Sequence, residues 1–476
     1  MRLPILLAAI LFSSVPNLSA QTSDLDPRIQ KLVSAVSQER LEQLLRKLQS
    51  FETRNTMSSA DSPTRGIGAA RQWILDEMKS SSSRLQVSFD TYQLPKQGQR
   101  ILRDIELRNV MAILPGRSPR RIYISGHYDS LARDPKSQRQ GFDWLNADNF
   151  APGANDDGSG TVLTMELARV FGGSGIDFDA TLVFIAFAGE EQGLIGAKAH
   201  AQQAAAEKLA IDAVLNNDMV GNSQGGSGSN DSETVRVFSD GPEDSPSRQI
   251  ARFIQRWAAR YYPQQRVELI ARHDRFGRGG DHTAFNENGY PGVRITEANE
   301  NYSRQHTVED TVEGVDFAYL ARNARVNAAV AAVMALAPPA PAIERTAPPQ
   351  TTATSASAAR GQVASGSQSA PAGEAPRQPT PAPRGPMLGR QPSGYDARLQ
   401  WQGSPGATGY RVFWRRAWTP DWEQELTVGN VTEYVMPNVS IDDYVFGVAA
   451  LDAGGHESLT SVYVNPERRE ERVIVK

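Results

Sequence analysis

The sequence predicts an α/β protein with a central, mostly parallel mixed sheet flanked by helices, followed by a small all-β sandwich. Short apolar runs typical of buried strands alternate with longer segments of helical periodicity over residues 21–336. A segment rich in Pro, Ala and Ser follows at 337–392, and strand-like alternation returns at 393–466. These observations predict two folded parts joined by a linker.

The first 20 residues are predicted to be a signal peptide. Arg2 precedes the apolar run Leu3–Phe12, which is too short to span a bilayer. Small residues, Ser19 and Ala20, stand before the predicted cleavage point at Gln21. We therefore expect a secreted or periplasmic protein. The rest of the sequence predicts no membrane span, because no other stretch is long and apolar enough.

Residues 21–336 are predicted to form the α/β domain. Leucine and valine recur at helical spacing over residues 23–82, which predicts helices there. The remaining pattern predicts strands within 109–116, 121–130, 181–191, 211–221 and 289–297, and helices within 160–172, 245–262 and 315–336.

Composition limits the chemistry. The formal net charge of -4 provides no strong basic field, which argues against nucleic acid as a partner. The chain has no cysteine, so an exported form has no disulfides and depends on a large core. Any metal site must use His, Asp and Glu, which indicates zinc, manganese or similar ions.

The C-terminal third is predicted to contain a linker, a small domain and a tail. Residues 337–392 contain almost no large apolar side chains and are expected to be a disordered or extended linker. Residues 393–466 resemble a fibronectin type III sandwich, with a tryptophan in an early strand and Tyr444 opening a late one. Residues 467–476 form a charged tail. We interpret the small domain as an attachment or spacer module that would bind a surface or another protein.

Two pairs of adjacent carboxylates point to bound cations. Glu190 and Glu191 stand side by side where a buried strand ends, although like charges repel and burial makes each costlier. Asp156 and Asp157 lie in a glycine-rich turn that leads into a helix. A capping role explains one aspartate but not the pair.

Histidines and a further aspartate stand at similar places. His127 ends a predicted strand and is followed by Asp129, which could accept a hydrogen bond from its imidazole. Strand ends converge on the ligand crevice of an open α/β sheet. Five residues at or just past such ends are therefore candidate metal ligands: His127, Asp156, Glu191, Asp218 and His306.

The motifs "GHYDS", "PGANDDGSG", "FAGEEQGLIG", "NDMVG" and "HTVEDT" occur in one order over residues 41–336. Together they resemble the secreted co-catalytic zinc aminopeptidases, peptidase family M28. The resemblance implies the phosphorylase/hydrolase-like fold of these zinc aminopeptidases, two Zn²⁺ ions and peptide or protein substrates. It implies an enzyme that releases N-terminal residues by attack of an activated water.

The resemblance also implies a role for each matching residue. Asp156 would bridge the two ions, His127 and Asp218 would complete one site, and Glu191 and His306 the other. Asp129 would support His127, and Asp157 would follow the bridging ligand through a cis peptide bond. Glu190 would be the general base that takes the proton of the attacking water and passes it to the leaving amine.

Some positions depart from the family pattern. Gln305 stands where some relatives have a tyrosine that donates to the tetrahedral intermediate, and Tyr302 is the nearest tyrosine. Asp157 and His282 are further candidates for a substrate contact, although His282 reads better as a structural residue. The alternative is a carboxypeptidase, in which Arg272, Arg275 and Arg278 would bind the terminal carboxylate of the substrate, or another amide hydrolase on this scaffold. A third hypothesis is a non-catalytic binding protein.

Overall fold

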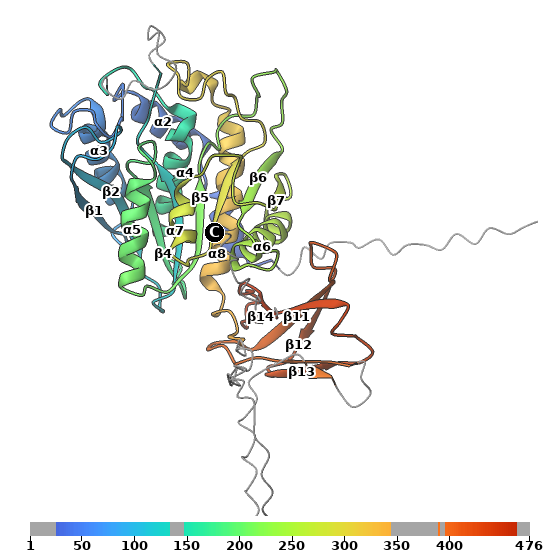
Figure 1. Cartoon of the computed structure of the whole chain (residues 1–476). Helices are drawn as coiled ribbons and strands as arrows, with labels where there is room; N and C mark the ends of the chain where they lie inside the picture. The colour runs from blue at the N-terminus through green and yellow to red at the C-terminus, as the bar shows by residue number, and fades with distance from the viewer. Residues whose placement is uncertain (1–24, 134–146, 344–388, 391–395, 464–476) are drawn as a thin grey trace, which may run out of the picture.

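The computed structural model describes residues 25–133, 147–343, 389–390 and 396–463 (Figure 1). The predicted signal peptide, most of the predicted linker and the charged tail lie outside these residues. Figure 1 shows a large α/β part, residues 25–343, and a smaller β part beside its lower end. In the described part of the chain, no helix is both long and apolar enough to cross a membrane.

Three helices open the chain, as the periodicity predicts: α1 (Pro27–Ser34), α2 (Gln38–Gln49) and α3 (Gly66–Ser81). Asp26 and Ser37 cap the first two, because their side-chain oxygens accept amide hydrogens of the first turn. The leucines of α2 share one buried face, which packs against the rest of the domain.

The central sheet has eight strands in the order β1-β2-β4-β3-β5-β8-β6-β7. Strands β4, β3, β5 and β8 run parallel, whereas the pairs β1–β2, β2–β4 and β8–β6 are antiparallel. The sheet is therefore mixed, with the predicted parallel arrangement at its centre. The strand bounds are β1 Gln86–Leu94, β2 Ile105–Leu114, β3 Arg121–His127, β4 Thr181–Phe187, β5 Ile211–Asn217, β6 Thr234–Ser239, β7 Arg266–Ile270 and β8 Gly292–Glu297.

Helices cover both faces of this sheet. Successive residues of a strand point to opposite faces, so Phe184 of β4 enters one core and Ile185 the other. The first core includes α4 (Ser159–Gly172), α6 (Pro246–Tyr261) and α8 (Phe317–Leu336). The second includes α5 (Ile195–Ala206) and α7 (Asp281–Glu287). Two short turns of helix, Ala154–Gly158 and Val312–Gly314, precede α4 and α8.

The C-terminal part consists of two antiparallel sheets, ordered β13-β10-β9 and β12-β11-β14-β15. Both contribute to one core, in which Trp401 packs on Tyr410 with ring centroids 5.2 Å apart. This is the predicted small all-β domain, and its resemblance to fibronectin type III remains a prediction. The bounds are β9 Gly389–Arg390, β10 Ala397–Gln400, β11 Gly409–Arg416, β12 Gln424–Val428, β13 Glu433–Met436, β14 Tyr444–Leu451 and β15 Ser461–Tyr463.

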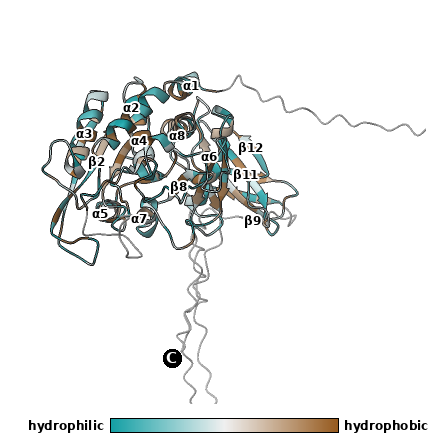
Figure 2. Cartoon of the chain, turned by 90° about the horizontal axis from the view of Figure 1, so that it is seen from above, coloured by the Kyte–Doolittle hydropathy of each residue, from teal (hydrophilic) through white to brown (hydrophobic). Residues whose placement is uncertain are grey.

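The small domain packs against the α/β domain, an arrangement that the sequence did not predict. Figure 2 shows β11 and β12 beside α6. Arg415 donates to both carboxylate oxygens of Asp244, just before α6, at 2.8 Å. Arg256 of α6 lies 3.3 Å from the buried carboxylate of Glu457. The small domain is thus held by charged contacts, and whether it also binds a surface stays a prediction.

His456 joins the small domain to the start of α1. Its Nδ1 lies 2.7 Å from Asp452, and its Nε2 lies 2.8 Å from Asp26, which also pairs with Arg28 and donates its amide to Tyr261. Burial lowers the pKa of His456, but the two carboxylates outweigh it, so the pKa lies above the usual 6.5. The protonated imidazole therefore stabilises the contact.

We expect replacement of His456 with Gln to cost about 1–2 kcal/mol at pH 6 and clearly less at pH 9. A group whose pKa is raised by folding stabilises the folded protein fully when the pH is below the pKa of the group in the unfolded chain. This stabilisation is lost as the pH rises through the pKa of the group in the folded protein. Thermal unfolding of the wild type and H456Q at both pH values measures the effect. An equal deficit at pH 6 and pH 9 would contradict a charge-dependent contact.

Candidate metal centre

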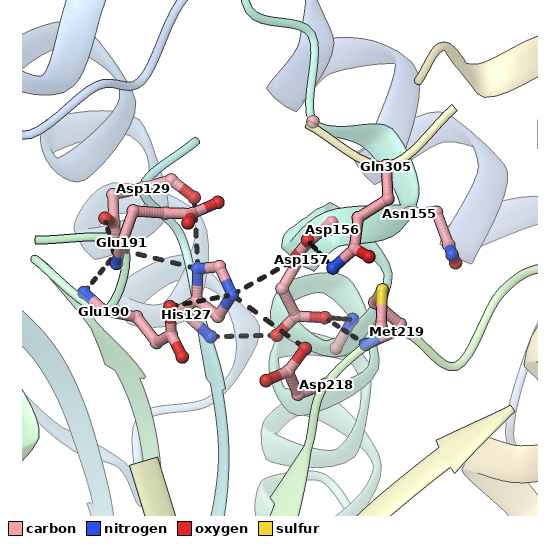
Figure 3. A network of polar contacts seen from close by, with 12 residues as sticks. His127, Asp129, Asn155, Asp156, Asp157, Glu190, Glu191, Asp218, Met219 and Gln305 are labelled. Atoms are coloured by element: carbon pink, nitrogen blue, oxygen red, sulfur yellow. Dashed lines mark hydrogen bonds and ion pairs between the residues drawn. The ribbon is translucent and has the colours of Figure 1, made fainter. Parts of the chain in front are cut away.

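The predicted ligands lie at one edge of the sheet because the central strands are parallel. His127 is the last residue of β3, Glu190 and Glu191 lie in the turn after β4, and Asp218 follows β5 directly. Since parallel strands end on the same side, these side chains converge (Figure 3). All three ligand candidates among them, His127, Glu191 and Asp218, are buried.

Asp156 lies between the two histidines. Its Oδ1 is 3.3 Å from Nε2 of His127, and its Oδ2 is 3.0 Å from Nε2 of His306. The turn that carries it, Ala154–Gly158, holds the Asp156–Asp157 peptide bond in the cis form, as the resemblance implies. One carboxylate thus faces two imidazoles with different oxygens, the arrangement expected of a ligand shared by two ions.

The remaining ligand candidates complete a cluster on each side of Asp156. Glu191 Oε1 lies 3.1 Å from Nε2 of His306, in a geometry that makes no hydrogen bond among the described residues. Asp218 Oδ1 lies 4.0 Å from Nε2 of His127. The possible ligand atoms of Asp156, Glu191 and His306 lie within 4.8 Å of one another, and so do those of His127, Asp157 and Asp218. Buried carboxylates and imidazoles that meet in this way form a donor set that suits zinc.

Asp129 ties His127 to the turn that carries the two glutamates. Its backbone oxygen lies 3.1 Å from Nδ1 of His127, so Nε2 is directed toward Asp156. Its carboxylate accepts the amide hydrogens of Glu190 and Glu191 at 3.1 and 3.2 Å. Asp129 therefore contacts the imidazole that the resemblance expects it to support, and it also holds the turn, a contact that the resemblance did not imply.

Asp157 lies close to His127 and Asp218 but is better explained as part of the framework. One of its oxygens accepts the amide hydrogen of His127, and the other accepts those of Gly160 and Met219, at 2.9–3.1 Å. These bonds join β3, α4 and the segment after β5. Because both oxygens are engaged by the backbone, the carboxylate of Asp156 is the one available to an ion.

Glu190 is the acidic side chain beside the candidate ligands. Its Oε2 lies 4.0 Å from Nε2 of His127. Burial raises the pKa of Glu190 well above its usual value; the nearby imidazole of His127 opposes this shift, and the carboxylates of Asp218 and Glu191 add to it. A carboxylate in such surroundings holds a proton more readily than one in water, which suits a group that accepts and returns a proton.

The surroundings of Gln305 differ from those of Tyr302 and His282, two of the candidates for a substrate contact. Gln305 donates from Nε2 to Asp156 Oδ2 at 2.7 Å, while Arg278 donates to its Oε1 at 3.3 Å. Tyr302 is 63% exposed, and its ring lies 5.6 Å from the Arg278 guanidinium. His282 is completely buried and contacts the backbone oxygen of His273, which supports the structural reading.

Two charged residues near the ligands were not assigned from the sequence. Arg294 of β8 is buried and donates to the carboxylate and the backbone oxygen of Asp218. Asp310 accepts the amide hydrogens of Asn155 and Asp156, both at 3.0 Å, and so fixes the turn. Arg294 could have been identified from the sequence, because it is a charged residue between Val293 and Ile295 in an apolar strand.

Replacing Arg294 with Met is expected to destabilise the metal-free protein by about 3–5 kcal/mol, because Asp218 would keep a buried charge without its partner. Arg266, which is largely exposed and 4.0 Å from Asp231, offers a matched control, and R266M should cost under about 0.5 kcal/mol. Chemical denaturation in the presence of a chelator measures both. An R294M loss as small as that of the control would show that the pair contributes little.

Comparison with known proteins identifies the family. The model of peptidase family M28 matches residues 109–331, which carry all the ligand candidates. A protein of Pyricularia oryzae named "Probable zinc metalloprotease" is 34% identical over 482 residues, covering 93% of this chain and 85% of that protein. The chain belongs to peptidase family M28. A protein of the same name from Pyrenophora tritici-repentis is 32% identical, covering 91% of this chain and 96% of that protein.

The fold of this M28 peptidase also matches a solved structure. The LapA aminopeptidase of Legionella pneumophila superposes with a TM-score of 0.51 and 19% sequence identity, covering 70% of this chain and 80% of that one. At this identity the likeness concerns the fold alone. It agrees with the α/β fold class predicted from the strand and helix pattern.

Proposed function

We propose that this zinc metallopeptidase is an exported aminopeptidase that uses two zinc ions and Glu190 as its general base. The observation that carries the proposal is the position of Asp156, with one oxygen facing His127 and the other facing His306. The relatives named zinc metalloproteases support zinc as the metal. Export and the fibronectin type III character of residues 393–466 belong to the same proposal.

The residues present fit two ions that share one ligand. His127 and Asp218 would hold one ion and Glu191 and His306 the other, with Asp156 between them. This assignment uses imidazole and carboxylate donors only, as a chain without cysteine requires. When bound, the ions polarise the scissile carbonyl and lower the pKa of the attacking water.

Glu190 would move the proton. Its carboxylate lies beside the ligand cluster, and Asp129 fixes its backbone amide, so it can accept the proton of the attacking water. The same carboxyl group then returns the proton to the leaving amine. The donation would occur as the C–N bond breaks, so that the amine leaves in its neutral form.

Gln305 would take the place of the tyrosine found in some relatives. Arg278 holds its carbonyl oxygen, so its amide hydrogens are directed at the Asp156 side of the site. An amide donor in that position can stabilise the negative charge that develops on the substrate oxygen. The exposed Tyr302 is less well placed for this role.

The surroundings of the site favour an aminopeptidase over a carboxypeptidase. Of the three arginines considered as a clamp for a terminal carboxylate, Arg275 is paired with Glu300 at 2.6 Å. Arg278 contacts Glu300 and Gln305, and Arg272 stacks on the ring of Phe276 at 3.5 Å. LapA, with which the chain shares its fold, is itself named an aminopeptidase.

A mixed peptide library tests the activity, with half of the peptides free and half acetylated at the N-terminus. The zinc-loaded protein should shorten only the free half, one N-terminal residue at a time, as followed by mass spectrometry. Loss of C-terminal residues from both halves would assign a carboxypeptidase instead. Failure to cleave any peptide, with zinc bound, would contradict a peptidase of either kind.

A further inference from the structure

A pocket lies next to the turn that carries Glu190 and Glu191. It is formed by the connection between β1 and β2, at residues 97–101, and by the first half of α5, and its volume is about 630 Å³. We call it the hairpin pocket. The residues that matter for its chemistry are Arg100, Gln192, Lys198 and Gln202.

The hairpin pocket is adjacent to the candidate ligands. Gln192, which lines it, directly follows Glu191 in the chain. Arg100 donates from Nη1 to the backbone oxygen of Glu191 at 3.3 Å, which holds the pocket wall against the ligand turn. One wall of the pocket is therefore in direct contact with the turn that carries a candidate ligand.

The lining of the hairpin pocket is cationic and polar. Arg100 and Lys198 line it, and the described lining residues include no acidic side chain. Gln192 is only 5% exposed, yet neither its Oε1 nor its Nε2 has a hydrogen-bond partner among the described residues. A buried amide without protein partners is costly, so water or a ligand group has to satisfy it.

We infer that the hairpin pocket is a substrate subsite that binds a carboxylate beyond the scissile bond. Arg100 and Lys198 supply the positive charge, and the amide of Gln192 supplies a hydrogen-bond donor. The carboxylate belongs either to an acidic side chain or to the C-terminus of a short peptide, because the two groups present the same chemistry. The inference rests on the proposed peptidase activity and names its preferred substrate class.

The test compares peptides that differ by one charge. One arm places Glu or Gln at the first or second position after the scissile bond, in peptides with a free N-terminus and an amidated C-terminus. The other arm compares a tripeptide with a free C-terminus against its amide. Kinetics are measured for the zinc-loaded wild type, for K198M, for the double variant R100Q/K198M and for K96M, in which a lysine of the same connection outside the pocket lining is changed.

In at least one arm, we expect the kcat/KM of the wild type to be about tenfold higher for the peptide that carries the carboxylate. The difference should lie in KM, and kcat should stay within about twofold. K198M should reduce this ratio and the double variant should abolish it, while K96M keeps the ratio. The arm that responds identifies the source of the carboxylate.

Equal cleavage of charged and uncharged peptides by the wild type would overturn the inference but leave the peptidase intact. A ratio that survives in R100Q/K198M would overturn it as well. Arg100 touches the ligand turn, so zinc content is measured for each variant, and K198M reports on the charge without that contact. Absence of cleavage of every peptide would instead refute the proposed function, and the inference with it.

Discussion

Replacing Glu190 with Gln is expected to lower kcat for peptide hydrolysis by about 10²–10⁴-fold, the usual contribution of a general base. The amide cannot accept the proton of the attacking water, although it has nearly the same shape. Zinc content should not change, because Glu190 is not an assigned ligand. Steady-state kinetics and metal analysis of the same preparation measure both quantities.

Glu287 provides the matched control, since it is an exposed glutamate on α7. E287Q should keep kcat within about twofold, as expected for a surface change away from the site. An E190Q protein that retains more than a tenth of wild-type kcat with full zinc content would refute the assignment. The general base would then have to be sought among other groups near the ligands.

Replacing Asp156 with Asn is expected to weaken both metal positions at once and to lower activity by at least about 10³-fold. The neutral amide is a poor zinc ligand, and one change removes a donor from each ion. D156N should hold fewer than one zinc per chain after dialysis against a zinc buffer that keeps the wild type loaded. Metal analysis by mass spectrometry measures the zinc content.

Asp76 is a control for charge alone, because it is exposed on α3 and contacts Gln72. D76N should keep the wild-type zinc content and activity. A D156N protein with the zinc content of the wild type would contradict a shared ligand. Loss of one zinc with the other fully retained would mean that Asp156 serves only one position.

The central strands and the ligand cluster were predictable because their signals are strong and local. The runs that became β3, β4 and β5 are almost wholly buried, so their sequences are apolar and stop sharply at polar residues. The motifs around His127, Glu191 and Asp218 stand at those stops, whereas Asp156 lies in the turn before α4. The structure brings His306 to them from a distant segment, as the resemblance implied.

The edges of the sheet were harder to predict. Strands β1, β6 and β7 were not among the expected elements. β1 alternates exposed and half-buried residues and contains Asp90 and Thr91, so its apolar signal is weak. Pairing with a neighbouring strand, which no local pattern encodes, decides whether such a segment becomes a strand.

Long-range charged contacts were also beyond the sequence. The pairing of Arg294 with Asp218 joins residues 76 positions apart. The contact of His456 with Asp26 joins the two domains across 430 positions. Each contact depends on the completed fold. The sequence therefore shows an unusual charge in an apolar strand or a histidine in a small domain, but not the residue that it contacts.

The most direct test of the two-ion centre is a crystal structure of the zinc-loaded protein with anomalous diffraction measured at the zinc edge. The account predicts two anomalous peaks about 3.5–4 Å apart, with Asp156 between them. One peak should contact His127 and Asp218, and the other Glu191 and His306. A single peak, or two peaks that do not share Asp156, would contradict the account.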